Sequence, residues 1–297
     1  MTSETPVMIV APGAGNGTRV PVLRCADALR PAEVTVREVD SPAEANQALA
    51  EAADGGHRLV VAGGDDEIRA ILRQLVRRVL PKGGDRTGLR DDRTIPDLPA
   101  LGLLPLDASA DDDLCAVLGL PRQPEAVAAA VRAGTSRRLD LLRHDGGSVT
   151  MHAALLGGRS ENGLPAPWTA SVTVDDTVLC APDELLLAVG VTNAGRLDAL
   201  PGLALTTQAD PTDGALDVAV AVPVRHGRWP RKPRTEVEVR RLRGRAVAIT
   251  PVRLPGAEAE QNGSDLRIPT IDDGAASTVN RKRTWWVEPG AWAVYTG

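Results

Sequence analysis

Phenylalanine is absent from this chain of 297 residues, and Tyr295 is its single tyrosine. Leu, Val, Ala and Ile must therefore supply most of the hydrophobic core. Cysteine is also scarce, because only Cys25, Cys115 and Cys180 occur, widely spaced and in apolar surroundings. An odd number of such cysteines predicts buried thiols in a reducing compartment.

Long hydrophobic runs are missing as well. No apolar stretch approaches the roughly 20 residues needed to cross a bilayer. The N-terminus, Met1-Thr2-Ser3-Glu4, lacks the charged and apolar regions of a signal peptide. We therefore expect a cytoplasmic protein. The net charge of -5 argues against a general nucleic-acid binder, which is normally basic.

The first part of the chain alternates strand and helix signals. The predicted strands are Val7–Val10, Val34–Val39, Leu59–Ala62 and Ala100–Leu104, and the predicted helices end near Leu29, Ala53, Leu80 and Ala133. Ser41-Pro42-Ala43-Glu44 has the spacing of a capping box with proline at the first helical position. This alternation predicts an α/β domain over residues 1–134, with a parallel sheet covered by helices. Pro81–Pro99 is rich in Gly, Pro, Asp and Arg and is predicted to be a long mobile loop.

The pattern changes after Gly134, where short segments with strand propensity follow one another without a helical period. They are Arg138–Leu142, Val149–Leu155, Ser171–Val174, Leu185–Thr192, Leu216–Val222, Val237–Val239, Ala246–Thr250, Trp285–Val287 and Ala291–Tyr295. We predict a mostly antiparallel β domain over residues 135–284.

Two glycine-rich turns carry the chemical signal. Leu59–Ala62 is followed by Gly63, Gly64 and Asp65, so glycines stand where a strand passes into a helix. Such turns let backbone N–H groups approach a phosphate beside the positive end of a helix. The next residues, Asp66 and Glu67, place carboxylates where that phosphate would sit.

The earlier turn, Pro12–Gly17, offers three glycines after the first strand. It is similar to a dinucleotide fingerprint, but Thr18 stands where the third glycine of that fingerprint belongs. An ordinary strand-to-helix turn is the favoured interpretation.

Taken in order, these motifs resemble the diacylglycerol and sphingosine kinase family over most of the chain. The matching segments are Ala11–Gly15 for Asn-Pro-x-x-Gly, Gly63–Glu67 for Gly-Gly-Asp-Gly-Thr, Pro105-Leu106 with Asp113–Pro121, Arg138–Leu141, Asn193 with Asp213–Asp217, and Ile271–Ala275 before Pro289-Gly290. The resemblance implies a fold of the NAD-kinase and diacylglycerol-kinase type. It also implies that the final strands, residues 285–297, return to the first domain and that a cleft between the domains holds the site.

The resemblance further implies the roles of individual residues. It implies catalytic roles for Asp65 and Asp273, with the family's general base replaced by Ala275. It implies nucleotide contacts by Pro12, Gly13, Gly15, Gly63, Gly64, Asp65, Glu67 and Ser109, and metal ligation by Asp113, Asp140, Asp213 and Asp217. The expected cofactors are ATP and Mg²⁺, and the expected partner is a lipid or other small acceptor, with at most peripheral membrane contact.

Departures from the family pattern oppose this chemistry. A carboxylate about 4 Å from a phosphate costs on the order of 1 kcal/mol in water-like surroundings and about 4 at an effective dielectric near 20. Asp66, Glu67, Asp111 and Asp112 all replace glycine, threonine or asparagine. Loss of a general base typically costs a factor of roughly 10²–10⁴. Glu258, Glu260 and Asp272 are candidates for a replacement base, and nothing in the sequence selects one.

The retained aspartates allow two interpretations of equal weight. In the first interpretation the aspartates keep a metal-organised centre, because carboxylates suit Mg²⁺. In the second interpretation the same residues cap helices and stabilise turns. Two functions follow from them: a kinase of weak or altered activity, or a non-catalytic member that binds a ligand or partner. An NAD-dependent oxidoreductase is less favoured because the glycine fingerprint is broken.

A basic stretch lies late in the chain. It comprises Arg225, Arg228, Arg231, Lys232, Arg234, Arg240, Arg241, Arg243 and Arg245. Such a surface can bind anionic lipid, but a solvated face of two strands is the favoured interpretation.

Overall fold

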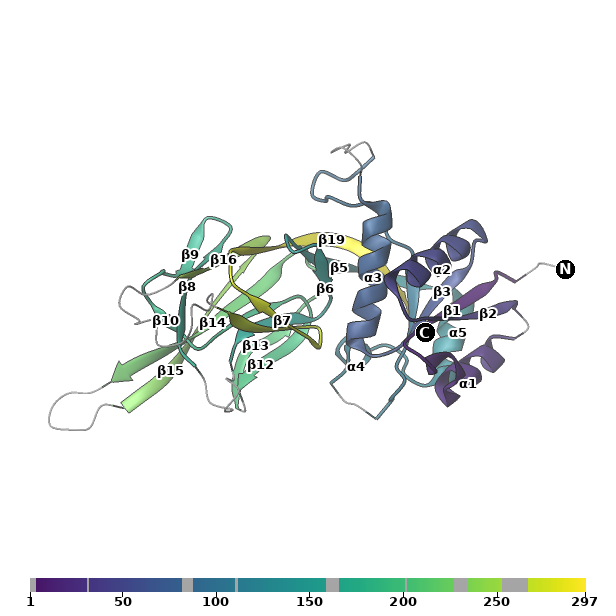
Figure 1. Cartoon of the computed structure of the whole chain (residues 1–297), viewed down its shortest axis with the longest axis horizontal. Helices are drawn as coiled ribbons and strands as arrows, with labels where there is room; N and C mark the ends of the chain where they lie inside the picture. The colour runs from purple at the N-terminus through teal and green to yellow at the C-terminus, as the bar shows by residue number, and fades with distance from the viewer. Residues whose placement is uncertain are drawn as a thin grey trace. The chain divides into compact units, whose positions relative to one another are not determined.

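The chain forms two compact units in a computed structural model that describes residues 4–30, 32–81, 88–109, 112–158, 166–200, 202–226, 234–252 and 267–297. The first unit comprises Met1–Leu141 and Glu288–Gly297, and the second comprises Leu142–Val287. Figure 1 shows the elements of both. Strands β5 (Ser136–His144) and β19 (Arg283–Tyr295) each begin in one unit and end in the other.

The first unit is an α/β domain with a parallel sheet. Its strands are β1 (Val7–Pro12), β2 (Val34–Val39), β3 (Arg58–Ala62) and β4 (Ala100–Leu104), in the order β2-β1-β3-β4. The end of β19 pairs with β4 in parallel, with Ala293 opposite Ala100. The last residues of the chain thereby extend the sheet that its first residues begin.

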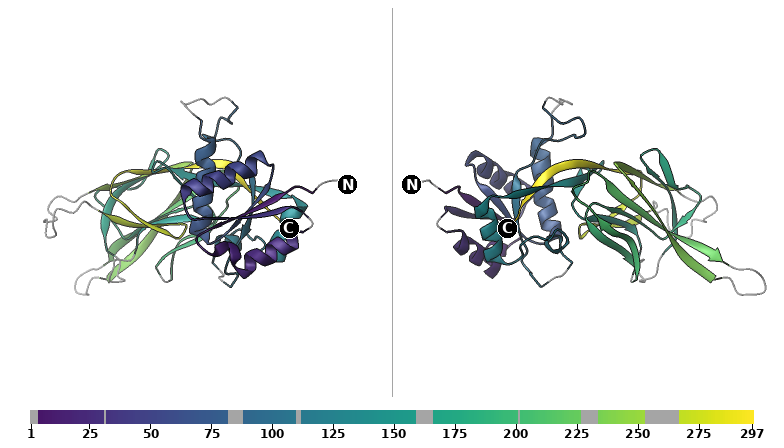
Figure 2. Two further views of the ribbon diagram at one scale, coloured as in Figure 1. Left: turned by 45° about the vertical axis from the view of Figure 1, so that its right-hand side comes forward. Right: turned by 180° about the vertical axis from the view of Figure 1, so that it is seen from behind.

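Helices cover both faces of this sheet (Figure 2). They are the short η1 (Asn16–Thr18), α1 (Val20–Leu29), α2 (Pro42–Asp54), α3 (Asp65–Val79), α4 (Leu114–Val117) and α5 (Pro124–Ala133). Helices α1 and α5 pack with Val7, Ile9 and Ala11 in one core cluster. Because side chains alternate along a strand, Met8 and Val10 face the other side.

Local signals explain where these helices begin and end. Ser41 Oγ accepts the N–H of Glu44 at 3.2 Å, as the capping-box spacing predicts. Gly134 closes α5 in the left-handed region, at φ 72°, which glycine adopts without strain. The interval predicted as a mobile loop contains no helix or strand in its described part. Its second half is nevertheless anchored, because Ile95 and Leu98 are fully buried.

The second unit is a mostly antiparallel β domain. One sheet has the order β15-β14-β11-β7-β17-β18, and the other contains β10-β8-β16 and the start of β19, with β9 beside β8 and β5 beside β6. The bounds are β6 (Ser148–Thr150), β7 (Ala153–Gly157), β8 (Trp168–Val174), β9 (Thr177–Cys180), β10 (Leu185–Leu186), β11 (Ala188–Thr192), β14 (Leu216–His226), β15 (Arg234–Gly244), β16 (Ala246–Val252), β17 (Ile268–Asp272) and β18 (Ala275–Val279).

The two sheets enclose one core, in which Val172 and Ile249 meet Val189 and Val218. A separate hairpin, β12 (Gly195–Leu200) with β13 (Leu203–Ala209), covers Ala219 and Ala221 on the outer face of the six-stranded sheet.

Several predicted strands differ in extent from the observed ones. The segment predicted as one strand from Val149 to Leu155 is broken into β6 and β7, because the backbone turns at Met151 and His152. Conversely, the two predicted segments at the C-terminus are one continuous strand, β19, although it contains Pro289 and Gly290. Strands β9, β12, β13, β17 and β18 were not predicted, since they are short, polar or exposed on one face.

Candidate functional site

The turn between β3 and α3 is closed by a carboxylate of the chain itself. Glu67 reaches back from the first turn of α3, and its Oε2 accepts the N–H of Gly64 at 2.8 Å. Its Oε1 accepts Asn16 Nδ2 at 3.1 Å. A Cβ on Gly63 would lie 2.6 Å from Glu67 Oε2, so the carboxylate fills the space that this glycine leaves. The positive end of a helix stabilises acidic residues there, as it would a phosphate.

A second carboxylate closes the earlier glycine turn. Glu38, on β2, accepts the N–H of Gly15 on Oε1 at 2.9 Å and the N–H of Gly17 on Oε2 at 3.0 Å. Gly13 and Gly15 have φ of +90° and +78°, a conformation that glycine adopts without strain and that disfavours other residues. Three glycine N–H groups of the two turns are therefore already bonded to carboxylates.

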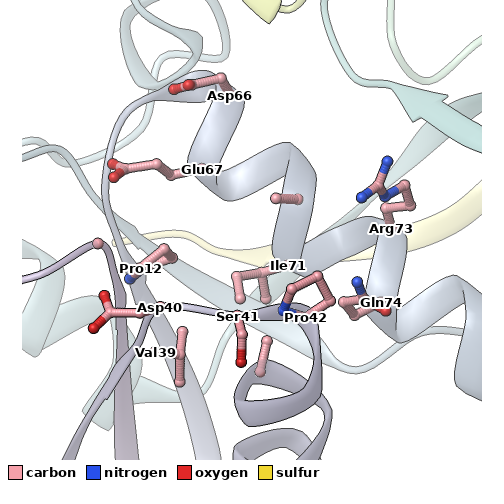
Figure 3. Close-up of a pocket in the computed structure, with 13 residues that line it drawn as sticks. Pro12, Val39, Asp40, Ser41, Pro42, Asp66, Glu67, Ile71, Arg73 and Gln74 are labelled. Carbon is pink, nitrogen blue, oxygen red and sulfur yellow. The ribbon is translucent and has the colours of Figure 1, made fainter.

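A pocket of about 290 Å³ opens beside these turns (Figure 3). It lies where β1 and β2 end, between α2 and α3. Its lining residues are Pro12, Gly13, Val39, Asp40, Ser41, Pro42, Ala45, Asp66, Glu67, Ala70, Ile71, Arg73 and Gln74. Of the residues predicted to contact a nucleotide, Pro12, Gly13 and Glu67 line this pocket, whereas Gly15, Gly63, Gly64, Asp65 and Ser109 do not.

Charges of both signs line the pocket. Among the residues that the structure describes, Asp40, Asp66 and Arg73 have no side-chain hydrogen bond or ion pair. Burial lowers the pKa of the Arg73 guanidinium, and the neighbouring charges of Arg77 and Arg69 lower it further. Figure 3 shows Asp40 and Glu67 on one side of the pocket and Arg73 on the other, with Pro42 and Ile71 between them.

Asp65 and Asp113 organise the start of α4. Both carboxylate oxygens of Asp65 lie 3.1 Å from the N–H of Leu114. Asp113 caps the same helix through the N–H of Ala116 at 2.8 Å and pairs with Arg122, also at 2.8 Å. These contacts correspond to the interpretation in which the motif aspartates cap helices.

The other three predicted metal ligands lie on strands or turns. Asp140, 2% exposed on β5, accepts the N–H of Gly290 at 2.6 Å. Asp213 and Asp217, in the second unit, both bond Arg243. Burial raises the pKa of Asp217, Arg243 lowers it, and Asp213 raises it further. In the described part of the chain, no three His, Cys, Asp or Glu side chains gather in a way that could hold a metal ion.

Asp273 holds the backbone turn between β6 and β7. Its carboxylate accepts three successive N–H groups, those of Met151, His152 and Ala153, at 2.6, 2.9 and 3.0 Å. Asp273 and Gly274 form the two-residue turn between β17 and β18, and both have positive φ. Ala275, at the position of the family's base, follows directly and has no ionisable group.

The candidate replacement bases divide into two groups. Asp272 is buried, accepts Thr150 Oγ1 at 2.7 Å and lies 3.5 Å from His144 Nε2. Glu258 and Glu260 lie outside the described residues, as does Asp111. Ser109, predicted to contact a nucleotide, donates both its N–H and its hydroxyl to Asp107 instead. These two bonds lower the pKa of Asp107.

Sequence reasoning missed Glu38, Asn16, Asp40 and Arg73. The first two form contacts with residues distant in the sequence. Glu38 accepts the N–H of Gly17, which lies 21 positions earlier, and Asn16 donates to Glu67, which lies 51 positions later. Asp40 had a detectable signal, because an acidic residue after the second strand commonly faces a ligand in α/β folds.

Three arginines of the basic stretch, Arg240, Arg241 and Arg243, are bound through their side chains to the protein itself. Arg240 pairs with Glu184 and Glu238, and Arg241 donates to the carbonyl of Leu205. Arg228, Arg231 and Lys232 lie outside the described residues.

Comparison with known proteins identifies the family. Residues 6–144 match the family model of the diacylglycerol kinase catalytic domain. Residues 6–144 therefore form a domain of the diacylglycerol kinase catalytic family. No curated protein matches its sequence.

Solved structures share the fold of the chain along its whole length. A crystal structure of a diacylglycerol kinase from Bacillus anthracis strain Sterne is 14% identical, with a TM-score of 0.66, and the match covers 100% of this chain and 98% of that one. Two further structures from that strain are 14% and 13% identical, both with a TM-score of 0.66, and the matches cover 100% of this chain and 99% of theirs. No helix in the described ranges is long and apolar enough to cross a membrane.

Proposed function

We propose that this family member binds a small organic molecule in the pocket of its first unit and does not transfer phosphate from ATP. One observation carries the proposal: Glu38 and Glu67 occupy the glycine N–H groups that a nucleotide phosphate would need. These carboxylates act as built-in anions, and a second anion beside them is repelled.

The residues present do not fit the phosphates of ATP. To bind the turn after β3, a phosphate must displace Glu67 from Gly64 and then lie near Asp66, which also lines the pocket. Each carboxylate about 4 Å away opposes it by on the order of 1 kcal/mol in water-like surroundings and about 4 at an effective dielectric near 20. Asp65 and Asp113 are engaged in holding α4. The pocket itself, with its apolar walls, remains suited to a ligand without a polyphosphate chain.

Isothermal titration with Mg·ATP tests this proposal on the native protein and on a Glu38→Ala/Glu67→Ala variant. A double variant with exposed acids replaced, Glu33→Ala/Asp54→Ala, controls for the change in net charge. We expect no saturable binding of Mg·ATP by the native protein or by the control variant. Inorganic pyrophosphate, titrated in the same way, should bind to the Glu38→Ala/Glu67→Ala variant and not to the native protein.

Phosphate transfer distinguishes the competing function. If the native protein moves the γ-phosphate of ATP to diacylglycerol in mixed vesicles, the protein is a kinase and the proposal is wrong. If the Glu38→Ala/Glu67→Ala variant folds and still binds no pyrophosphate, the two carboxylates are not what excludes phosphate.

A further inference from the structure

We propose that the pocket beside the glycine turns binds a zwitterionic small molecule, with a cationic amine at its acidic side and an anionic group at Arg73. This inference rests on the proposed function, because it names the ligand class of the same pocket. The shared chemistry, an amine and an acid on one compact frame, occurs in free amino acids and in zwitterionic lipid headgroups.

The size and walls of the pocket favour a compact ligand. Its volume of about 290 Å³ lies at the lower end of the range for small-molecule sites. Pro12, Val39, Pro42 and Ile71 supply apolar surface between the charged residues. A ligand that fills this space can bury a short carbon frame and present polar groups at its two ends.

The acidic side of the pocket favours a cation. Among the described residues, the carboxylates of Asp40 and Asp66 have no bonded donor, and Glu67 adds a third negative charge. The donors that Glu67 already accepts, Gly64 N–H and Asn16 Nδ2, are both neutral. An ammonium group with three N–H donors satisfies the open acceptors without repulsion.

The opposite side of the pocket favours an anion. Arg73 has no acidic partner within the described residues, and its Nε is buried without an acceptor. Arg69 and Arg77 stand one turn before and after it on α3, so the local charge is positive. A carboxylate or a single phosphate pairs with the planar guanidinium in a bidentate manner.

Together the two sides set the selectivity. A simple amine leaves Arg73 without a partner, and a simple acid leaves the carboxylates without one. A polyphosphate places negative charge against Asp40 and Asp66. A zwitterion is the class of ligand that compensates both ends at once (Figure 3).

Titration calorimetry with matched probes tests the inference on the full chain. The zwitterions are glycerophosphoethanolamine, glycerophosphocholine, L-glutamine and L-leucine, and the single-charge probes are ethanolamine and glycerol 3-phosphate. We expect at least one zwitterion to bind about tenfold tighter than either single-charge probe, since one charge-assisted pair is worth roughly a decade in affinity. Preference within the zwitterions separates a lipid headgroup from a free amino acid.

Variants locate the binding. Arg73→Gln and Asp40→Asn should each weaken zwitterion binding by about tenfold, whereas Arg73→Lys should retain part of it. Arg132→Gln is the matched control, because Arg132 is an exposed arginine of helix α5 that does not line the pocket. Circular dichroism on every variant confirms that it is folded.

Three results would overturn the inference: saturable binding by no zwitterion, equal binding by a single-charge probe, or binding unaffected by Arg73→Gln. These outcomes are distinct from failure of the proposed function. Phosphate transfer from ATP would refute that function even if a zwitterion binds, and an inert protein that binds no zwitterion would refute the inference alone.

Discussion

Glu38 Oε2 accepts the backbone N–H of Gly17 at 3.0 Å, across 21 positions of the chain. The bond ties strand β2 to the turn after β1, and the second oxygen of the same carboxylate holds Gly15. An ionised acceptor makes these bonds stronger than neutral ones. A side chain of the protein thus occupies backbone donors that would otherwise be open to a ligand.

Glu38→Ala is expected to lower the free energy of unfolding by about 1 kcal/mol. The N–H groups of Gly15 and Gly17 would lose a charged acceptor and bond to water instead. Urea denaturation followed by circular dichroism measures the change. Glu33→Ala is the control, since the Glu33 side chain is exposed. Equal stability of the two variants would show that the Glu38 bonds contribute nothing.

Asp273→Asn is expected to destabilise the second unit by about 2 to 4 kcal/mol, because an amide N–H₂ would face buried backbone N–H groups. The native carboxylate accepts three of them and is 5% exposed. Thermal unfolding measures the loss, with Asp176→Asn in an exposed turn as the control. An unchanged melting temperature would favour the catalytic role predicted for Asp273.

Glu288 anchors the end of the segment between α3 and β4. It is fully buried and accepts both the N–H of Thr94, at 2.6 Å, and the Thr94 hydroxyl. Glu288→Ala is expected to release this segment and to raise the rate of tryptic cleavage after Arg90 and Arg93 severalfold, since cleavage follows local opening. Mass spectrometry of timed digests measures it. Cleavage at the native rate would mean that burial of Ile95 and Leu98 is sufficient to hold the segment.

Acid should weaken the contact between Glu184 and Arg240. The backbone N–H of Ala181 and the Arg240 guanidinium lower the pKa of Glu184 below its usual range. When folding lowers the pKa of an acid, the ionised acid stabilises the protein at every pH above its pKa in the unfolded state. That stabilisation is lost as the pH falls through the lower pKa of the folded state. Glu184→Gln should therefore cost about 0.5 kcal/mol near neutral pH, an amount reduced by solvent screening.

The pH dependence of this loss is the measurement. The difference in unfolding free energy between Glu184→Gln and the native protein should be full above the unfolded pKa of a glutamate, about 4.3, and should shrink as the pH falls through the lowered folded-state pKa. Asp183→Asn, in the adjacent position, is the control for the loss of one carboxylate. A difference that persists in acid would mean that the effect does not come from the carboxylate charge.

The three cysteines should be unreactive in the native state. Burial raises the pKa of Cys25, Cys115 and Cys180 to about 12 each, so little thiolate exists in mildly alkaline solution. Ellman's reagent is expected to titrate no thiol in the native protein and three in guanidinium. Rapid reaction of one thiol without denaturant would show that its surroundings open readily.

Strands and helices with strong local signals could be predicted closely. Strand β2 has the predicted bounds, helix α5 ends at the predicted Ala133, and Ser41 caps α2 as its spacing indicates. Prediction failed where the signal is not local. The break between β6 and β7 depends on Asp273, more than a hundred positions away, and β19 is continuous because pairing on both sides holds it.

The candidate site shows the same division. The sequence places Gly63, Gly64 and Glu67 at a strand-to-helix turn, because residues so close in the sequence need no long-range contact to be recognised. It cannot show that Glu38 reaches the other turn, since that bond depends on the register of β1 with β2. Nor can it bring Arg73 to the pocket that Asp40 lines.

Composition and order of motifs determined the class of this protein. The alternation of strands and helices, followed by strands alone, specifies an α/β unit and a β unit because periodicity is a local property of the chain. Tertiary packing decided the chemistry. Whether a glycine N–H is open to a ligand depends on which side chain reaches it. Glu67 closes Gly64 from the same turn, but Glu38 reaches Gly15 and Gly17 from a neighbouring strand.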